Sequence, residues 1–191
     1  LDITATDTPQ FFGDNQTSWF RTFFANGSLV FNSSFENWTF GNTDVSASQC
    51  FRNAFLFNQK IELFRNKNLL NLGSTFQGCT IFNQELNFLN VSNNTNFSSC
   101  FQDAPAFNQP LNNWNTSSGV TFRRMFQNAY AFNQDISSWD FSSCTNLDSL
   151  EDFMTGKTDL DYSATYYDNL LNKWALDISL GGLPADVLDI I

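Results

Sequence analysis

A short motif, Phe-Asn-Gln, recurs at a constant interval and constrains the fold of this chain more than any other feature of its sequence. Its four copies stand 25 residues apart, at 57–59, 82–84, 107–109 and 132–134. A Phe lies six residues ahead of each copy, and degenerate copies occur at 31–33 and after residue 150. Strict register over four copies predicts a protein built from repeats that stack on one another.

Aligning the repeats gives columns that stay apolar while their neighbours vary. Such columns predict side chains that face inward along the core of a stacked array. The composition fits this prediction, because 23 of the 191 residues are Phe. The residues assigned to the core are Phe51, Phe76, Phe101, Phe126, Phe57, Phe82, Phe107, Phe132, Trp114 and Trp139.

Each repeat divides into two halves with different periodicity. The first half has apolar residues at i, i+3, i+4 and i+7, as at 122, 125, 126 and 129, which is typical of one face of a short helix. The second half, 132–136, alternates with a period of two and predicts a short strand. We therefore expect an α/β repeat solenoid of leucine-rich-repeat-like coils of about 25 residues, each a short parallel β-strand plus a short helix, with a helical C-terminal cap.

The repeats divide the chain into three expected parts. Residues 1–18 form an N-terminal segment or cap, 19–159 the repeat solenoid of about five to six coils, and 160–191 a C-terminal cap and docking tail. Residues 176–180 alternate in polarity and predict an edge strand, and the apolar tail after them predicts docking on a neighbouring copy or larger assembly. The residues expected to cover the last coil are Tyr167, Leu170, Leu171 and Trp174.

Composition and charge exclude several classes of function. The chain has no His, which excludes His-based triads and imidazole acid–base chemistry. A net charge of −10 argues against nucleic-acid binding, and no apolar run is long enough for a membrane span. The acidic residues are scattered rather than paired, and Asp159 and Asp161 lack the frame of a calcium loop. We expect no catalytic residue, cofactor or metal site.

The cysteines have positions in the repeat that predict free thiols. Cys50 and Cys100 share a column two repeats apart, a separation of about 10 Å at the usual strand spacing, which is too long for a disulfide. Cys79 replaces a small apolar residue of the first half, and Cys144 precedes the next repeat in another column. We expect all four to be small buried apolar side chains.

Polar columns and sequons are the remaining candidates for sites. An amide ladder, in which each Asn bonds its neighbour one coil along, is expected for Asn58, Asn83, Asn108 and Asn133. Phe55, Tyr130 and Phe141 vary between repeats and are candidates for a contact surface, with burial of some of them at the corners of the coils as the alternative. Eight sequons are fewer than twice the number expected by chance, so turn and cap roles are favoured over glycosylation. The possible glycosylation sites are Asn15, Asn26, Asn32, Asn37, Asn90, Asn93, Asn96 and Asn115.

The amino-acid sequence of the repeat resembles that of a known family. The segment FRRMFQNAYAFNQDISSWDFSSCTNL, residues 122–147, is similar to the "MF-x-x-A-x-x-FNQ-D-I-S-x-W-D" repeat of BspA-like surface proteins, also described as the domain of unknown function 285. Residues 162–175, YSATYYDNLLNKWA, resemble the terminator of that family. The resemblance covers about residues 19–175 and implies surface adhesion or partner binding. This chain departs from the pattern in its Phe-rich first halves and in residues 176–191.

Two functions of different classes follow. The first is a non-enzymatic structural or adhesive module of an extracellular, cell-surface or virion protein, which presents a solenoid face to a protein or glycan partner or to copies of itself. The second is a carbohydrate-active parallel β-helix, of the polysaccharide lyase or phage depolymerase type. The helical spacing in every repeat argues against the second, as does the lack of a cationic cluster beyond Lys60, Arg65 and Lys67.

Overall fold

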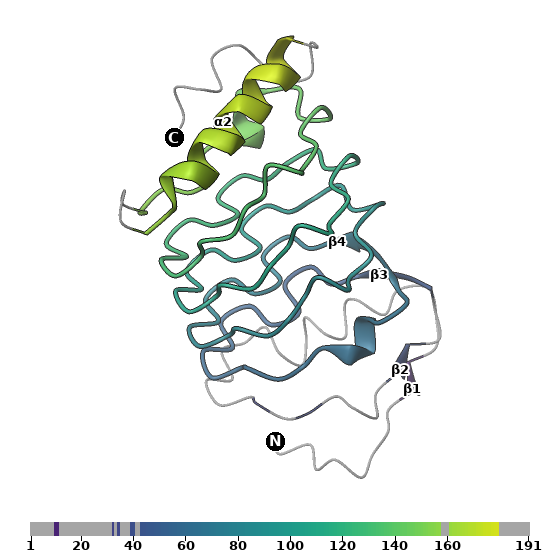
Figure 1. Ribbon diagram of the computed structural model, residues 1–191. Helices are drawn as coiled ribbons and strands as arrows, with labels where there is room; N and C mark the ends of the chain where they lie inside the picture. The colour runs from purple at the N-terminus through teal and green to yellow at the C-terminus, as the bar shows by residue number, and fades with distance from the viewer. Residues whose placement is uncertain are drawn as a thin grey trace.

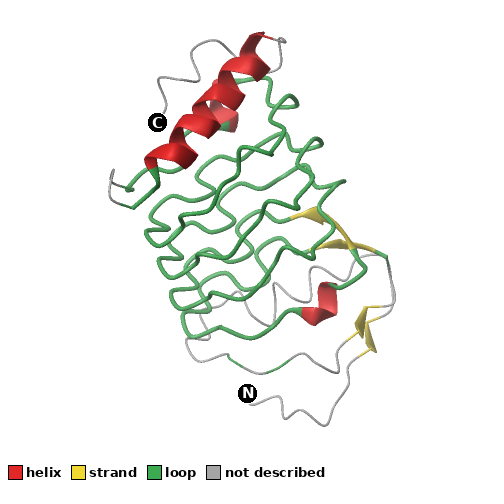
Figure 2. Cartoon of the chain, viewed as in Figure 1, coloured by secondary structure: helices red, strands yellow, loops and turns green. Residues whose placement is uncertain are grey.

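The structure is a computed structural model that describes residues 10–11, 32, 34, 39–40, 43–157 and 161–179. From residue 43 to residue 157 the backbone passes back and forth in layers that lie side by side, and helix α2 (Ala164–Ser179) lies at the C-terminal end of these layers (Figure 1). Loops and turns make up most of the layered part, with few residues in helix or strand (Figure 2). One layer is one 25-residue repeat, because backbone and side-chain hydrogen bonds join residues about 25 apart.

Two short pairs of strands open the chain. Strand β1 (Gln10–Phe11) pairs in parallel with β2 (Thr39–Phe40). Strand β3 (Asp44–Ser46) pairs in parallel with β4 (Asn68–Asn71), one repeat later, with Val45 opposite Leu69. Parallel pairing across one repeat is what stacked repeats require, since each repeat runs in the same direction as the one before it.

Beyond β4, backbone hydrogen bonds between repeats continue without regular strand geometry. Alternate N–H groups of one repeat donate to carbonyl groups of the next at 2.8–2.9 Å. The donors in the third repeat are Phe97, Ser99, Phe101 and Asp103, and the acceptors are Thr121, Arg123, Met125 and Gln127. These bonds satisfy backbone groups that would otherwise be buried without a partner.

The segment expected to be a short helix, 122–129, forms two successive turns instead. The N–H of Met125 bonds the carbonyl of Phe122, and the N–H of Ala129 bonds that of Phe126, both at 3.0 Å. Arg124 and Asn128 have φ angles of 56° and 58°, in the left-handed region that a right-handed helix cannot include. The apolar positions are still buried, because two four-residue turns also bring i, i+3, i+4 and i+7 to one side.

The second half of the repeat also differs from its expected secondary structure. Residues 132–136 are not assigned to a strand. Two short 3-10 helices, η1 (Glu62–Phe64) and η2 (Leu147–Ser149), are the helical elements within 43–157. The leucine-rich-repeat-like solenoid class stays a prediction, while the element content of the described repeats consists of turns joined by inter-repeat hydrogen bonds.

The interior holds the aromatic columns. All ten residues assigned to the core are buried. Along each Phe column, rings of neighbouring repeats lie 5.5–6.0 Å apart with interplanar angles of 3–13°. The two Phe rings of one repeat stack at 3.9–4.3 Å. Trp114 and Trp139 stack at 6.0 Å, and their indole N–H groups donate to the carbonyls of Leu86 and Leu111.

The spacing of the repeats changes at the C-terminal end. The N–H of Phe101 bonds the carbonyl of Met125, whereas that of Phe126 bonds the carbonyl of Phe153, three residues farther on than the repeat predicts. The 3-10 helix η2 falls within this longer segment. The extra residues explain why the Phe motif loses its register at Phe153.

Helix α2 continues through the residues that were expected to start an edge strand. Residues 176–179 belong to this helix, so the strand prediction is wrong there. The alternating pattern of five residues is too short to distinguish a strand from the last turn of a helix. The expected docking tail beyond residue 179 lies outside the described residues.

The cysteines are free and buried, as their columns predicted. Burial raises the pKa of the Cys79 and Cys144 thiols to about 12 and that of Cys50 and Cys100 further still. Among the described residues, no helix has the length and apolar character needed to cross a membrane.

Candidate functional site

A ladder of Asn side chains runs along one edge of the repeats. The Oδ1 atom of Asn58 accepts the backbone N–H of Asn83 at 2.9 Å, Asn83 does the same for Asn108, and Asn108 for Asn133. The same oxygen accepts Nε2 of the Gln that follows in the next repeat, at 2.9–3.0 Å. The ladder partners are therefore a backbone amide and a Gln, rather than the neighbouring Asn side chain that was expected.

This Asn ladder extends past the four perfect repeats at both ends. Asn32 accepts the N–H of Asn58 at 3.0 Å, and Asn133 accepts the N–H of Ser163, just before α2, at 2.8 Å. The Oδ1 atoms of the ladder accept two hydrogen bonds each, except that of Asn133, which accepts one. We therefore interpret these side chains as parts of the frame rather than as ligand-binding groups.

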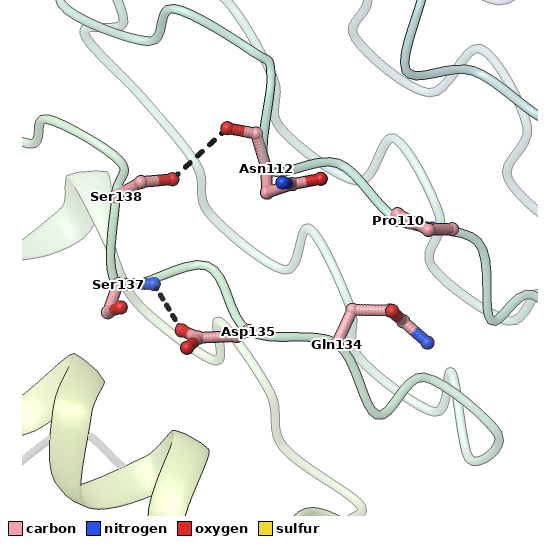
Figure 3. Close-up of a pocket in the computed structure, with 6 residues that line it drawn as sticks. All are labelled: Pro110, Asn112, Gln134, Asp135, Ser137 and Ser138. Carbon is pink, nitrogen blue, oxygen red and sulfur yellow. Dashed lines mark hydrogen bonds between the residues drawn. The ribbon is translucent and has the colours of Figure 1, made fainter.

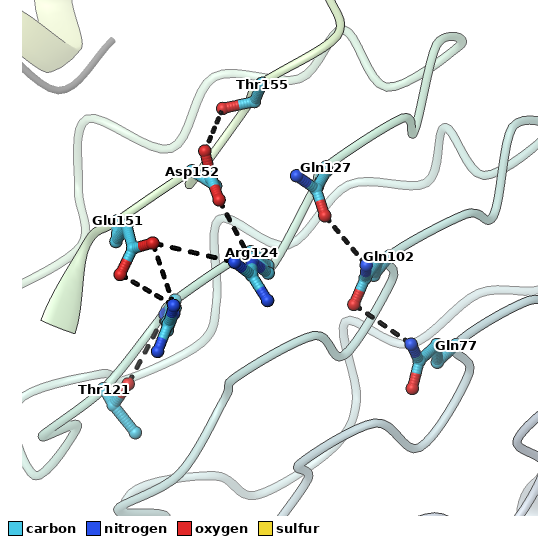
Figure 4. Close-up of polar contacts among 9 residues, drawn as sticks. Gln77, Gln102, Thr121, Arg124, Gln127, Glu151, Asp152 and Thr155 are labelled. Atoms are coloured by element: carbon cyan, nitrogen blue, oxygen red, sulfur yellow. Dashed lines mark hydrogen bonds and ion pairs between the residues drawn. The ribbon is translucent and has the colours of Figure 1, made fainter. Parts of the chain in front are cut away.

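A second ladder, which the sequence interpretation missed, is formed by Gln side chains (Figure 4). Gln77 donates to Gln102 at 3.0 Å, and Gln102 donates to Gln127 at 2.8 Å. The signal was present, because Gln follows Phe in three of the four motifs. A side-chain ladder of this kind fixes adjacent repeats in register on a second edge.

The ladder edge ends in a group of charged residues (Figure 4). Arg124 bonds Asp152 at 3.0 Å, and Arg123 bonds Glu151 at 2.8 Å. The hydrogen bond from Arg124 holds the pKa of Asp152 below its ordinary value. These pairs join the last two repeats, where the spacing has changed, and they are partly exposed.

A hollow of about 510 Å³ opens between the third and fourth repeats (Figure 3). Helix α2 lies close to it, since Nδ2 of Asn169 is 3.5 Å from Oδ2 of Asp135. The residues that line this hollow are Pro110, Asn112, Gln134, Asp135, Ser137 and Ser138. The volume lies within the range of about 300–1,000 Å³ typical of small-molecule sites.

Asp135 is the one carboxylate in this hollow. Desolvation raises its pKa, but hydrogen bonds from Ser137 and Asn169 lower it more, so the net pKa lies below the ordinary value. The N–H of Ser137 donates to Oδ1 at 2.9 Å, which closes an Asx turn. Asp135 is thus ionised at neutral pH and is suited to accept hydrogen bonds rather than to donate a proton.

Several large apolar side chains lie on the exterior. Tyr130 is 49% exposed, and in the neighbouring column Leu56 and Ile81 are 45% and 43% exposed. Phe55 is partly buried. Phe141 is fully buried against Trp174, so its assignment to a contact surface is wrong; a column that varies in sequence can still face the core where the end of the array closes.

The sequons coincide with turns of the repeat. Asn90 accepts the N–H of Ser92, and Asn115 that of Ser117, in Asx turns at equivalent positions. Asn96 accepts the N–H of Ser98 in the same way and is only partly exposed, whereas Asn90, Asn93 and Asn115 are exposed. Asn15, Asn26 and Asn37 lie outside the described residues. The Asx turn explains Asn-x-Ser at these sites without glycosylation.

The residues expected to cap the array lie on α2. Leu170 and Trp174 are buried, and Tyr167 and Leu171 pack partly buried against the same core. Within the part of the chain that the structure describes, no group of three Asp, Glu or Cys side chains could hold a metal ion.

A family model covers the repeats and the start of the cap, residues 45–166, which is more than half of the chain. No curated protein and no solved structure matches the chain significantly. The matching family is the one that the repeat motif predicted, and its description states no activity. On this match, the chain belongs to the family described as Mycoplasma protein of unknown function, DUF285.

Proposed function

We propose that this chain is a non-enzymatic binding module of a cell-surface or virion protein, which presents one long face of stacked repeats to a protein or glycan partner. The proposal includes the solenoid class, with each 25-residue repeat as one coil. Repeat arrays of this kind use an extended surface for binding, because neighbouring repeats place equivalent side chains in rows.

The observation that carries the proposal is the contrast between fixed interior columns and a varied exterior column. The exterior column is Leu56, Ile81, Ala106 and Ala131, and Tyr130 lies beside its last member. Two of these side chains are large, apolar and exposed by more than two fifths. Exposed apolar side chains grouped in rows are typical of a surface that contacts another molecule.

For the carbohydrate-active alternative, the structure removes one reason for rejection and adds another. Helical spacing no longer counts against it, because the segments are turns. However, a depolymerase that hydrolyses a glycosidic bond generally needs two carboxyl groups, and the hollow supplies one, Asp135. A polysaccharide lyase acts on acidic sugars, and the lining of the hollow has no positively charged side chain to bind them. No described feature favours catalysis over binding at this place.

The proposal is tested by a binding screen joined to an activity screen. Purified chain is passed by surface plasmon resonance over extracellular-matrix proteins and a glycan array, and is incubated with acidic polysaccharides while new reducing ends are measured. We expect binding without cleavage, and binding to a protein should weaken at least about tenfold in Leu56→Thr/Ile81→Thr.

The control for the variant is a second pair of exposed apolar residues, Leu70 and Val120, on another edge of the repeats. Leu70→Thr/Val120→Thr should bind the same protein as the wild type does. Cleavage of a polysaccharide, or equal loss of binding in both double variants, would overturn the proposal.

A further inference from the structure

The hollow is the place where a side-chain ladder stops. Residues 62, 87, 112 and 137 form one column, with Asn at the middle two positions. Nδ2 of Asn87 donates to Oδ1 of Asn112 at 3.0 Å, so the next bond of the ladder would run from Nδ2 of Asn112 to residue 137. Residue 137 is Ser, whose backbone N–H donates to Oδ1 of Asp135. Nδ2 of Asn112 has no hydrogen bond among the described residues.

The other lining residues add acceptors. Nε2 of Gln134 donates to Asn108, which leaves Oε1 of Gln134 without a hydrogen bond among the described residues. Oδ2 of Asp135 has only the long contact with Asn169 at 3.5 Å. Oγ of Ser138 donates to the carbonyl of Asn112 at 3.2 Å and keeps its lone pairs. The residues that line this concavity therefore supply one amide NH₂ group and several acceptor oxygens (Figure 3).

The charge of the hollow restricts what it can hold. Its six lining residues carry one negative charge and no positive charge, within a chain of net charge −10. Phosphate, sulfate and acidic sugars would be repelled at this place. Hydroxyl groups of a neutral ligand, which both donate and accept, match the mixed set of amide, carboxylate and hydroxyl groups.

We propose that the hollow is a subsite for a neutral sugar residue. The hydroxyl groups of the sugar bond to Asn112, Gln134 and Asp135, and its C–H face rests on the ring of Pro110. This inference rests on the proposed binding function and names the ligand class of one of its sites.

The structure suggests a variant that fills the hollow without disturbing the frame. Ser137→Asn places at 137 the residue that stands at 87 and 112, where it extends the ladder and takes the amino group of Asn112. The matched control is Ser142→Asn. Ser142 makes the same kind of turn, its N–H donating to Asp140 at 2.8 Å, but it lies outside the hollow.

The side-chain amide signals of Asn112 and Gln134 in ¹⁵N-labelled protein report binding directly. The probes are glucose, galactose, mannose and N-acetylglucosamine, with N-acetylneuraminic acid and the lysine analogue cadaverine as charged comparisons. We expect at least one neutral sugar to shift these signals with a Kd of about millimolar order. Ser137→Asn should weaken that binding at least about tenfold, and Ser142→Asn should leave it unchanged.

Three results would overturn the subsite: no neutral sugar shifts the signals, cadaverine alone shifts them, or Ser137→Asn binds as tightly as the wild type. The two proposals fail separately. If the chain binds a matrix protein through Leu56 and Ile81 while no sugar shifts the Asn112 signal, the binding function stands and the sugar subsite is rejected.

Discussion

The aromatic rings of the inner repeats pack in a different geometry from those at the C-terminal end of the array. Between Phe51 and Phe132, equivalent rings lie nearly parallel at 5.5–6.0 Å. At the end, Phe126 meets Phe153, and Phe141 meets Trp174, edge-to-face with interplanar angles of 86° and 88°. A repeated side chain can stack on its own copy, but the last copy has no successor, so a different element must cover it.

At the C-terminal end, the polar contacts between repeats are made by residues that do not recur in the other repeats. Lys157 stands where the other repeats have Ala or Cys, and its Nζ atom donates to the carbonyls of Ala129 and Tyr130 at 2.8 and 3.0 Å. Burial lowers the pKa of this amine to about 8. Arg124 likewise pairs with Asp152, whereas the inner repeats have Ser74 and Ser99 at the position of Arg124. The comparison implies that a core substitution costs most in the inner repeats and that, among the described residues, the ion pairs that join two repeats lie at this end.

Phe107→Ala should have the largest effect, because Phe107 is buried between rings of both neighbouring repeats and of its own. We expect the free energy of unfolding, measured by urea denaturation, to fall by about 3–5 kcal/mol. Tyr130→Ala removes an aromatic ring that is 49% exposed and should change stability by less than about 1 kcal/mol. Equal losses in the two variants would show that the rings are not arranged as described.

Leu170→Ala should have the next largest effect, since it removes an apolar contact that covers the last repeat. We expect a loss of about 2–4 kcal/mol, with hydrogen exchange accelerated first in 144–179. Leu176→Ala on the same helix changes a residue that is 54% exposed and should cost less than about 1 kcal/mol. Acceleration that begins in the inner repeats would contradict the capping role of α2.

Asn108→Ala should cost less, about 1–2 kcal/mol, because it leaves the N–H of Asn133 without its acceptor at a partly exposed edge and leaves Nε2 of Gln134 with only the backbone carbonyl of residue 108, at 3.2 Å. Asn108→Asp keeps an acceptor oxygen in place and should recover at least half of the loss in thermal unfolding. If Asp is no better than Ala, the ladder does not depend on this oxygen.

Arg124→Ala should have the smallest effect, under about 1 kcal/mol, because both partners of its ion pair are partly exposed. The pKa of Asp152 is lowered in the folded state, so its contribution is present above the unfolded pKa of about 3.9 and is lost as the pH falls through the lower folded value. The stability gap between wild type and variant should therefore shrink as the pH falls from about 3.9 through the lower pKa of Asp152 in the folded state. A gap that persists in acid would require another role for Arg124.

The sequence predicted the interior far better than the local backbone. All ten aromatic residues that the 25-residue columns assigned to the core are buried, because burial depends on which side of the repeat a residue faces, but Phe141, which was assigned to a contact surface, is buried as well. They did not distinguish a helix from two turns, since both place i, i+3, i+4 and i+7 together. Left-handed residues decide between them, and Arg124 has no sequence preference for that conformation. Asn does prefer that conformation, and the column of Asn128 contains only Asn, Gly and Asp, a pattern that predicts a turn.

The hollow was not predicted, because it arises from a difference between repeats rather than from the motif. The 25-residue spacing places Ser137 in the column of Asn87 and Asn112, but only the structure shows the hydrogen bond that makes this column a ladder. The Asn column was identified as a ladder, but its acceptors were assigned to the wrong donors, because the sequence does not show that backbone amides lie within reach.

Disulfide trapping tests most directly whether each repeat lies next to its successor at a spacing of 25 residues. The N–H of Val120 bonds the carbonyl of Thr95 at 2.9 Å, so Thr95→Cys/Val120→Cys places two exposed thiols on adjacent repeats. Leu70→Cys/Val120→Cys places them two repeats apart, about 10 Å, beyond the reach of a disulfide. After mild oxidation of dilute protein, mass spectrometry should find an intramolecular bond in the first variant and none in the second. A bond that forms equally fast between 70 and 120, or none between 95 and 120, would contradict the stacked register.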